Sequence, residues 1–236
     1  MKAVILAGGR GTRLRPHTLV LPKPLVPVGE KPVLELLIQR LKKFGLEEVI
    51  ITIGYLGGLI RAFCGDGNKW GMNISYSEEK EPLGTIGPLT LIEDQLRETF
   101  LLCNGDIITD LDIFKFMALH KEKGGIATVA IVRRKVKIDL GVLECHDGNR
   151  VASFVEKPER EYLASLGIYL FEPQLFDYVP KNVPFGFDDL MNTLLSKDIP
   201  IYSYLHSGYW LDIGIEEDFK RAQREFEAHR ERIMGD

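Results

Sequence analysis

Short apolar runs alternate along the chain with segments in which apolar residues recur every three or four positions. The runs have the length and β-branched composition of buried strands, whereas the recurring positions are typical of amphipathic helices. The predicted strands cover residues 2–6, 48–53, 73–77, 100–103, 126–132, 166–171 and 199–205. The predicted helices cover residues 33–44, 56–64, 87–96, 112–121, 187–195 and 216–231.

The order of these elements predicts the fold class. Strands and helices alternate in the first half, which favours a parallel sheet with helices on both faces. Two further strand-like segments, 141–145 and 151–155, flank a typical hairpin turn, so the second half is expected to be mixed. We therefore expect an α/β fold, a single Rossmann-like three-layer domain over residues 1–236 with a mixed, mainly parallel central sheet. Hexapeptide repeats are absent from the sequence, and no C-terminal β-helix is expected.

Composition narrows the function classes. The 236 residues carry a net charge of -4, which argues against general binding to nucleic acid or to an acidic membrane. The cysteines, Cys64, Cys103 and Cys145, are far apart and outside any CxxC pattern, so neither a disulfide framework nor a zinc site is indicated. No stretch approaches the length of a membrane-spanning helix. A reduced, cytoplasmic location is the simplest expectation.

The first 29 residues carry five Lys or Arg and no Asp or Glu, although the chain as a whole is acidic. Within them, a strand-like run leads directly into the loop Ala7-Gly-Gly-Arg-Gly-Thr-Arg13. Glycines allow backbone N–H groups to converge on an anion, and arginine adds fixed donors. The dinucleotide fingerprint GxGxxG fails at Leu14, and a Walker GxxxxGK[ST] motif is absent. The loop therefore predicts polyphosphate binding of another kind.

Acidic residues follow two later strands. Asn104-Gly105-Asp106 comes directly after residues 100–103, and Asp212 follows Tyr209-Trp210-Leu211. Because ligands bind outside the carboxyl ends of the strands in an open parallel sheet, we expect both carboxylates to lie near the glycine loop. A cationic loop that faces two carboxylates suits an anion bound together with a divalent metal.

Taken in order, the motifs resemble those of the nucleotide-sugar pyrophosphorylases, which are nucleoside-triphosphate:sugar-1-phosphate nucleotidyltransferases. The first motif is Leu6-Ala-Gly-Gly-Arg-Gly-Thr-Arg-Leu14, followed by Pro22-Lys23-Pro24-Leu25. Further matches lie at residues 65–67, 81–85, 104–106, 141–142, 155–158, 167–169 and 208–214. The resemblance covers nearly the entire chain, and residues 81–89 look most like those of mannose-1-phosphate guanylyltransferases.

The resemblance implies a role for each matched residue. It assigns nucleotide binding to Leu6, Ala7, Gly8, Gly9, Gly11, Thr12, Arg13, Lys23, Glu79, Gly84 and Asp106. By this resemblance the glycine backbone cradles the triphosphate, Arg13 grips its outer phosphates, and Lys23 reaches the phosphorus under attack. Asp106 and Asp212 match the ligands of Mg²⁺, the implied cofactor. Arg13, Lys23, Asp106 and Asp212 are therefore the expected catalytic residues.

The sugar-phosphate site is assigned by the same resemblance to Gly141, Glu156 and Lys157. A carboxylate accepts hydrogen bonds from vicinal hydroxyls, and a lysine binds the sugar phosphate as a point charge. Relatives usually carry Asn or Thr just before the Gly-Ile-Tyr motif, where this chain has Ser165 and Leu166. The identity of the sugar is therefore left open.

Glu79 bears on the choice of base. A carboxylate only accepts hydrogen bonds, so it suits the adjacent N1–H and 2-amino donors of guanine. Uracil and thymine present one donor between two acceptors. Glu79 therefore favours GTP, provided that its side chain points into the site.

These observations favour a guanylyltransferase acting on mannose 1-phosphate. A UTP- or dTTP-dependent hexose-1-phosphate enzyme and a heptose-1-phosphate enzyme are the alternatives. A catalytically silent regulatory subunit would be expected to lack one of the four catalytic residues, and all four are present. The implied partners are a nucleoside triphosphate and a sugar 1-phosphate, with no nucleic acid and no membrane. The resemblance also allows a homodimer.

Overall fold

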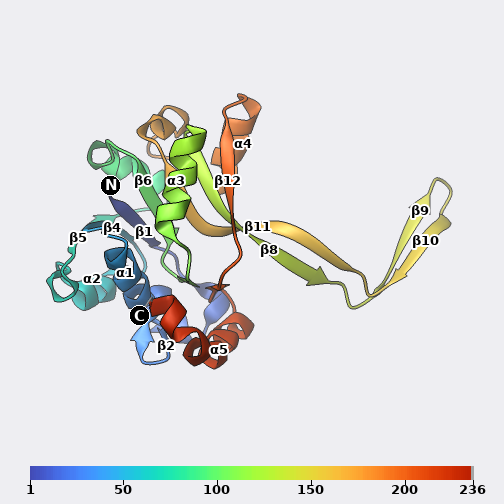
Figure 1. Cartoon of the computed structure of the whole chain (residues 1–236), viewed down its shortest axis with the longest axis horizontal. Coiled ribbons are helices and arrows are strands. Elements are labelled where there is room, and N and C mark those ends of the chain that lie inside the picture. The colour runs from blue at the N-terminus through green and yellow to red at the C-terminus, as the bar shows by residue number, and fades with distance from the viewer. Residues whose placement is uncertain (235–236) are drawn as a thin grey trace.

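A mixed sheet runs through the middle of the molecule in the computed structural model, which describes residues 1–234 (Figure 1). Within that range its seven strands lie in the order β12-β8-β11-β6-β1-β4-β5. They are β1 (Ala3–Ala7), β4 (Glu48–Ile53), β5 (Asn73–Glu78), β6 (Phe100–Asn104), β8 (Ala127–Lys137), β11 (Glu159–Phe171) and β12 (Ile201–His206). Strand β11 is antiparallel to both of its neighbours, and the other pairs are parallel. The predicted mixed, mainly parallel sheet is confirmed.

Helices cover both faces of this sheet. They are α1 (Val33–Lys43), α2 (Gly57–Cys64), α3 (Ile113–Lys123), α4 (Phe187–Ser196) and α5 (Glu216–Met234). Because side chains alternate along a strand, Ile5 packs with α1, α2 and α3 on one face, while its neighbour Val4 packs with α4 on the other. The three predicted layers are therefore present. Among the described residues, no helix is both long and apolar enough to cross a bilayer.

Residues 87–96 differ from the prediction, because Gly87–Gln95 forms a 3-10 helix (η5) rather than an α-helix. Pro88 stands in its first turn, and the buried Leu89 and Ile92 are three residues apart, the spacing that faces one side of a 3-10 helix. The backbone N–H groups of Ile86 and Gly87 both donate to the Phe185 carbonyl at 3.0 Å. Packing against the segment before α4 thus fixes this short element.

Strands β8 and β11 extend well beyond their predicted limits. The added residues include the charged run Arg-Arg-Lys-Val-Lys, 133–137, which hides the alternation of a strand. Pairing is supported by cross-strand contacts of Arg133 with Glu161 at 2.7 Å and of Lys135 with Glu159 at 3.0 Å. Beyond them lies the predicted hairpin, β9 (Gly141–His146) and β10 (Arg150–Glu156). Together they project from the sheet as a long ribbon (Figure 1).

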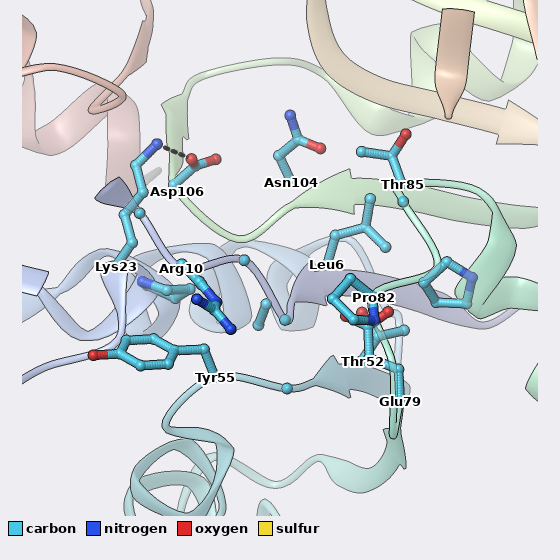
Figure 2. A pocket seen from close by; sticks show the side chains of 18 of the residues that line it. Leu6, Arg10, Lys23, Thr52, Tyr55, Glu79, Pro82, Thr85, Asn104 and Asp106 are labelled. Carbon is cyan, nitrogen blue, oxygen red and sulfur yellow. Dashed lines mark hydrogen bonds and ion pairs between the residues drawn. The ribbon is translucent and has the colours of Figure 1, made fainter. Parts of the chain in front are cut away.

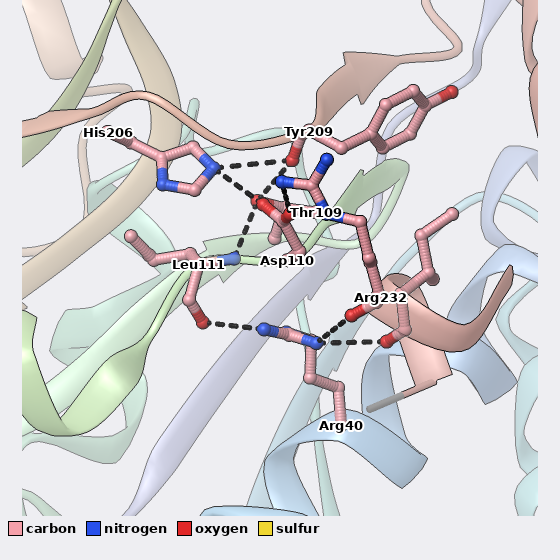
Figure 3. Close-up of polar contacts among 8 residues, drawn as sticks. Arg40, Thr109, Asp110, Leu111, His206, Tyr209 and Arg232 are labelled. Atoms are coloured by element: carbon pink, nitrogen blue, oxygen red, sulfur yellow. Dashed lines mark hydrogen bonds and ion pairs between the residues drawn. The ribbon is translucent and has the colours of Figure 1, made fainter. Parts of the chain in front are cut away.

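Helix α5 is held to the sheet by a buried polar network (Figure 3). The Arg40 guanidinium, on α1, donates to the carbonyls of Leu111, Arg232 and Ile233 at 2.9–3.1 Å. Burial lowers the pKa of Arg40, and the nearby Asp110 and Asp112 carboxylates oppose that effect. The Asp110 carboxylate also pairs with His206 at 3.0 Å and Arg232 at 2.7 Å. The network therefore joins α1, α5 and the end of β12.

We expect Arg40→Met to lower the free energy of unfolding by about 3 kcal/mol, because two buried carbonyls and one partly buried carbonyl lose a charged donor. Chemical denaturation measures the change. Arg230→Met removes the same charge from an exposed position of α5 and should stay within about 0.5 kcal/mol of the unsubstituted protein. Equal losses in the two variants would show that the buried network contributes nothing.

Candidate active site

The glycine loop leaves the carboxyl end of β1 in the middle of the sheet, with neighbours on both sides. Tyr55, after β4, donates its N–H to the Gly8 carbonyl at 3.2 Å, and Gly105, after β6, donates its N–H to the Leu6 carbonyl at 2.9 Å. Gly11 has φ +58°, a left-handed conformation that suits glycine, and its carbonyl accepts from Thr18 Oγ1 at 2.8 Å. The loop is thus fixed by three separate segments.

A small antiparallel ribbon brings the two predicted metal ligands together. It consists of β7 (Ile107–Thr109) and β13 (Trp210–Asp212), with Asp212 opposite Ile107. The N–H of Ile213 donates to the Asp106 carbonyl at 3.1 Å, which continues the ladder. Asp106 and Asp212 are far apart in sequence, and this pairing places them next to each other.

Lys23 lies between these carboxylates. Its ammonium forms an ion pair with Asp106 Oδ2, and it lies 3.4 Å from Asp212 Oδ1. The Lys23 side chain is 11% exposed, whereas those of Asp106 and Asp212 are 17% and 36% exposed. Burial and the Asp106 charge raise the pKa of Asp212, and the charges of Lys23 and Arg13 act in the opposite direction. Two carboxylates and Lys23 therefore share one partly buried site, and the charge of the exposed Arg13 acts on Asp212 from nearby.

The two aspartates fit a divalent cation. Asp106 Oδ1 is buried and has no hydrogen-bond partner, so one lone-pair-bearing oxygen is free to serve as a ligand. Among the described residues no group of three or more His, Cys, Asp or Glu side chains could hold a metal. Mg²⁺ is bound in proteins by one or two carboxylates together with substrate phosphates and water. The donor set thus suits a metal that arrives with a phosphorylated substrate.

A cavity of about 770 Å³ opens in front of the glycine loop (Figure 2). Its volume lies within the usual range for small-molecule sites. The lining residues are Leu6, Ala7, Gly8, Gly9, Arg10, Gly11, Thr12, Arg13, Lys23, Pro24, Thr52, Gly54, Tyr55, Glu79, Lys80, Pro82, Gly84, Thr85, Pro88, Asn104 and Asp106. Lys23 and Asp106 lie at one side of the cavity and Glu79 at the other (Figure 2). A ligand with an anionic end and a hydrogen-bonding end would match this polarity.

The Glu79 carboxylate is held at the edge of the cavity. Its Oε2 accepts from the N–H of Leu83 at 2.9 Å, and its Oε1 lies so close to Gly8 that a Cβ there would collide with it. Gly8 therefore admits the carboxylate beside the loop, which a larger residue would prevent. The side chain does point toward the cavity, which was the condition for its expected role.

The sequence is similar to those of known proteins over nearly its whole length. A model of the nucleotidyl transferase family matches residues 2–229. The chain belongs to this family. A UTP–glucose-1-phosphate uridylyltransferase from Synechocystis is 35% identical over 95% of the chain and 63% of that protein. A mannose-1-phosphate guanylyltransferase from Mycobacterium tuberculosis is 34% identical over 93% of the chain and 62% of that protein. The chain therefore spans less than two thirds of the length of these relatives.

Two solved structures have a similar fold. A putative glucose-1-phosphate thymidylyltransferase from Bacillus anthracis, in complex with sucrose, has a TM-score of 0.77 and 28% identity, covering 95% of this chain and 94% of that one. HddC from Yersinia pseudotuberculosis, complexed with GMP-PN, has a TM-score of 0.74 and 26% identity, covering 95% and 99%. The relatives differ in nucleotide and sugar, so family membership alone leaves both open.

Most residues expected for the nucleotidyl transferase site lie together. The eleven that line the cavity are Leu6, Ala7, Gly8, Gly9, Gly11, Thr12, Arg13, Lys23, Glu79, Gly84 and Asp106. Asp212 lies beside them, because its carboxylate pairs with the Lys23 ammonium. By contrast, Gly141, Glu156 and Lys157 lie on the projecting ribbon, and none of them is among the residues that line the cavity.

Sequence reasoning did not single out several of the residues that line this cavity. Arg10 was placed in the predicted phosphate-binding loop but was given no role of its own, and Thr52 and Tyr55 were not noted. A signal was available for Tyr55, because Gly54-Tyr55 follows the predicted strand 48–53 and so lies at the same sheet edge. The rule that ligands bind at the carboxyl ends of the strands, applied to every strand rather than to the acidic clusters alone, would have identified Tyr55.

Proposed function

We propose that this chain is a Mg²⁺-dependent sugar-1-phosphate nucleotidyltransferase that favours GTP and mannose 1-phosphate. The observation that carries the proposal is the convergence of the glycine loop, Lys23 and the two aspartates at one cavity. Membership of the nucleotidyl transferase family supports the same reaction class. The products are a nucleoside diphosphate sugar and pyrophosphate.

The reaction needs alignment and charge neutralisation more than it needs a nucleophilic side chain. An oxygen of the sugar phosphate forms a bond to the α-phosphorus of the triphosphate. The bond from that phosphorus to the bridging β-phosphate oxygen breaks in line, and its electron pair leaves with pyrophosphate. The attacking oxygen is already anionic, so no proton has to be removed. The chain supplies what such a step requires, which is oriented donors and positive charge around two anions.

Each side chain has a place in this scheme. The glycine-loop N–H groups and Arg13 bind the phosphates, and Lys23 neutralises charge at the α-phosphorus. Asp106 and Asp212 would hold the metal, since both are carboxylates beside the cavity and one oxygen is unpartnered. Mg²⁺, when bound, supplies Lewis-acid stabilisation of phosphate charge. Lys23 must then turn from the carboxylates toward the phosphate, a short movement for a flexible side chain.

The preference for GTP rests on Glu79. Its carboxylate lies across the cavity from Lys23, so a triphosphate held at Lys23 would place its base toward Glu79 (Figure 2). One oxygen already accepts from the Leu83 N–H at 2.9 Å, which orients the group without using up its acceptor capacity. Two adjacent acceptors remain for N1–H and the 2-amino group of guanine.

We expect Glu79→Gln to lower kcat/KM for GTP by about 10- to 100-fold and to change that for UTP little, because a glutamine offers one acceptor and one donor pair. Steady-state rates with both triphosphates measure the change. Glu78→Gln is the control, since Glu78 is exposed and pairs with Arg61 instead. A GTP:UTP ratio that does not change in Glu79→Gln would remove this residue from base selection.

The preference for mannose 1-phosphate rests on the sequence resemblance and on relatives such as the Mycobacterium tuberculosis enzyme. At the position where relatives carry Asn or Thr, Ser165 Oγ donates to Tyr169 Oη and accepts from the Gly167 N–H, both at 3.1 Å. That hydroxyl is therefore engaged within the chain. The sugar must be recognised mainly by other groups, chiefly Glu156 and Lys157.

Pyrophosphate release over a matrix of triphosphates and sugar 1-phosphates, with Mg²⁺, tests the proposal. We expect turnover with GTP and mannose 1-phosphate to exceed that of every other pair. Turnover confined to UTP or dTTP, or to a heptose 1-phosphate, would keep the reaction class and overturn the specificity. Absence of turnover with all pairs would favour a silent regulatory subunit and overturn the proposal.

A further inference from the structure

The Tyr209 carbonyl, one residue before β13, has more hydrogen-bond donors around it than an ordinary ladder carbonyl. It accepts from the Asp110 N–H and from Thr109 Oγ1, both at 3.1 Å. His206 Nε2 lies 3.3 Å from the same oxygen (Figure 3). A carbonyl oxygen has two lone pairs, so three donors saturate it. The start of β13 is therefore fixed both from β7 and from the end of β12.

The surroundings of His206 decide which of its ring nitrogens carries a hydrogen. Besides the Tyr209 carbonyl, Asp110 Oδ1 lies 3.0 Å from Nε2. A carbonyl and a carboxylate only accept hydrogen bonds, so Nε2 must carry the hydrogen that both of them face. Asp110 thus keeps the imidazole in the form that donates to Tyr209.

The Asp110 carboxylate is 10% exposed and lies at the centre of this arrangement. Its Oδ2 pairs with Arg232 at 2.7 Å. Its Oδ1 is buried and has no hydrogen bond among the described residues, because the Nε2–H of His206 points to the carbonyl. The turn before β13 closes tightly over this oxygen, since a Cβ at Gly208 would collide with it. A buried carboxylate oxygen without a hydrogen bond costs free energy, so stability alone does not account for the arrangement.

Strand β13 is too short to hold Asp212 in place by itself. It pairs with β7 over three residues, and a two-stranded ribbon of that length is not stable alone. Burial and, next, the Asp106 charge raise the pKa of Asp212, which means that the two ionised carboxylates repel each other. Contacts outside the ribbon must oppose this repulsion when Lys23 turns away. The Tyr209 carbonyl makes such contacts three residues before Asp212.

We propose that Asp110 is a positioning residue for the metal site. Through His206 and the Tyr209 carbonyl it fixes β13, so that Asp212 stands beside Asp106 before the metal arrives. The inference rests on the proposed function, because that function assigns Asp212 to Mg²⁺. Asp110 does not line the cavity, so it contributes to the affinity for metal rather than to the transfer step. Without it, part of the free energy of metal binding would be used to order β13.

Binding of Mn²⁺ to the protein without nucleotide tests this inference, because EPR measures free Mn²⁺ and this ion takes the same oxygen ligands as Mg²⁺. We expect Asp110→Asn to weaken Mn²⁺ binding about tenfold, as is usual for a residue that orients a metal ligand. His206→Leu should weaken it equally, although it removes no negative charge. The double variant should bind no more weakly than either single variant, because both residues act along one path.

Three results of the Mn²⁺ titration would overturn the proposal. The first is an unchanged affinity in Asp110→Asn. The second is no binding by the unsubstituted protein, because the site would then not be formed before the substrate arrives. The third is binding that survives in Asp212→Asn, because the ion would then lie elsewhere.

Three control variants separate positioning from charge and from stability. His206→Gln keeps an amide N–H for the Tyr209 carbonyl, so Mn²⁺ affinity should stay within about twofold of normal. Asp112→Asn removes the same charge two residues along the chain, where asparagine still caps α3, and should leave the affinity unchanged. Arg40→Met should lower the melting temperature at least as far as Asp110→Asn and still bind Mn²⁺ normally. A tenfold loss of affinity in any of the three would overturn the proposal.

Turnover gives a second readout, which a purely structural residue would not change. In Asp110→Asn the Mg²⁺ concentration for half-maximal turnover should rise about tenfold, while kcat at saturating Mg²⁺ stays within about threefold of normal. A loss of kcat that Mg²⁺ does not restore would place Asp110 in the transfer step and overturn its positioning role. Absence of turnover in the unsubstituted protein would overturn the proposed function alone, since Mn²⁺ binding would still measure the effect of Asp110.

Discussion

Asp106→Asn and Asp212→Asn are each expected to lower kcat about a thousandfold or more while the fold is kept. Both remove a negative charge that the proposed site uses to hold Mg²⁺, and an amide is a much weaker ligand for a hard cation. The measurement is steady-state pyrophosphate release at saturating substrates, with circular dichroism of each variant. Asp94→Asn, whose carboxylate is 92% exposed and pairs with Arg97, should have unchanged activity.

Asp212→Asn should in addition raise the melting temperature of the protein in EDTA. The pKa of Asp212 is raised in the folded state, so folding favours its protonated form, and the ionised carboxylate opposes folding at neutral pH. That cost is relieved as the pH falls through the raised pKa, and asparagine removes it at every pH. Near-normal activity in either variant would contradict the metal assignment. A lower melting temperature would show that Asp212 serves the fold.

Lys23→Met is expected to lower kcat by about 100- to 1,000-fold, because it removes the cation nearest to the proposed α-phosphorus position. Its effect on stability should have the opposite sign to that of Asp212→Asn. Without the ammonium, Asp106 and Asp212 repel each other across a partly buried site, so the melting temperature in EDTA should fall. Mg²⁺ should then raise it more than in the unsubstituted protein.

Melting curves with and without Mg²⁺, together with kcat, separate the two roles of Lys23. Lys31→Met is the matched control, since Lys31 contacts Gln39 and Glu35 and does not line the cavity. It should have full activity and an ordinary response to Mg²⁺. Lys23→Met with kcat within a few-fold of normal would place the residue in the structure alone and outside the chemistry.

The convergence of the candidate site residues could be predicted from the sequence because it follows from the topology of the sheet. Once residues 2–6 and 100–103 are recognised as parallel strands, their carboxyl ends are expected at the same edge of the sheet. That expectation alone places the glycine loop beside Asp106. The placement of Asp212 needed one further element, the β7–β13 ribbon, of which residues 107–109 are too short to show strand periodicity. Their pairing is a tertiary effect, and only the structure shows it.

The projecting ribbon and the Arg40 network could not be predicted for a related reason. The added residues of β8 are mostly charged, so they lack the apolar alternation of a strand. Their strand conformation depends on pairing with β11 rather than on burial. Arg40 belongs to an amphipathic helix, in which a charged residue would normally face solvent. Its guanidinium instead donates hydrogen bonds to the backbone carbonyls of Arg232 and Ile233 at the end of α5. Neither relation lies within a sequence window, because the partner residues are distant along the chain.

The most direct measurement follows the α-phosphorus itself by ³¹P NMR, with GTP, mannose 1-phosphate and Mg²⁺ in the presence of the unsubstituted protein. The proposed chemistry predicts that GTP resonances decline while those of a nucleoside diphosphate sugar and of pyrophosphate grow in equal amounts. Addition of excess pyrophosphate should drive the same resonances back, since the α-phosphorus only exchanges one phosphate oxygen for another. Growth of inorganic phosphate and GDP in their place would contradict the account, because it would place the bond that breaks at the γ-phosphorus.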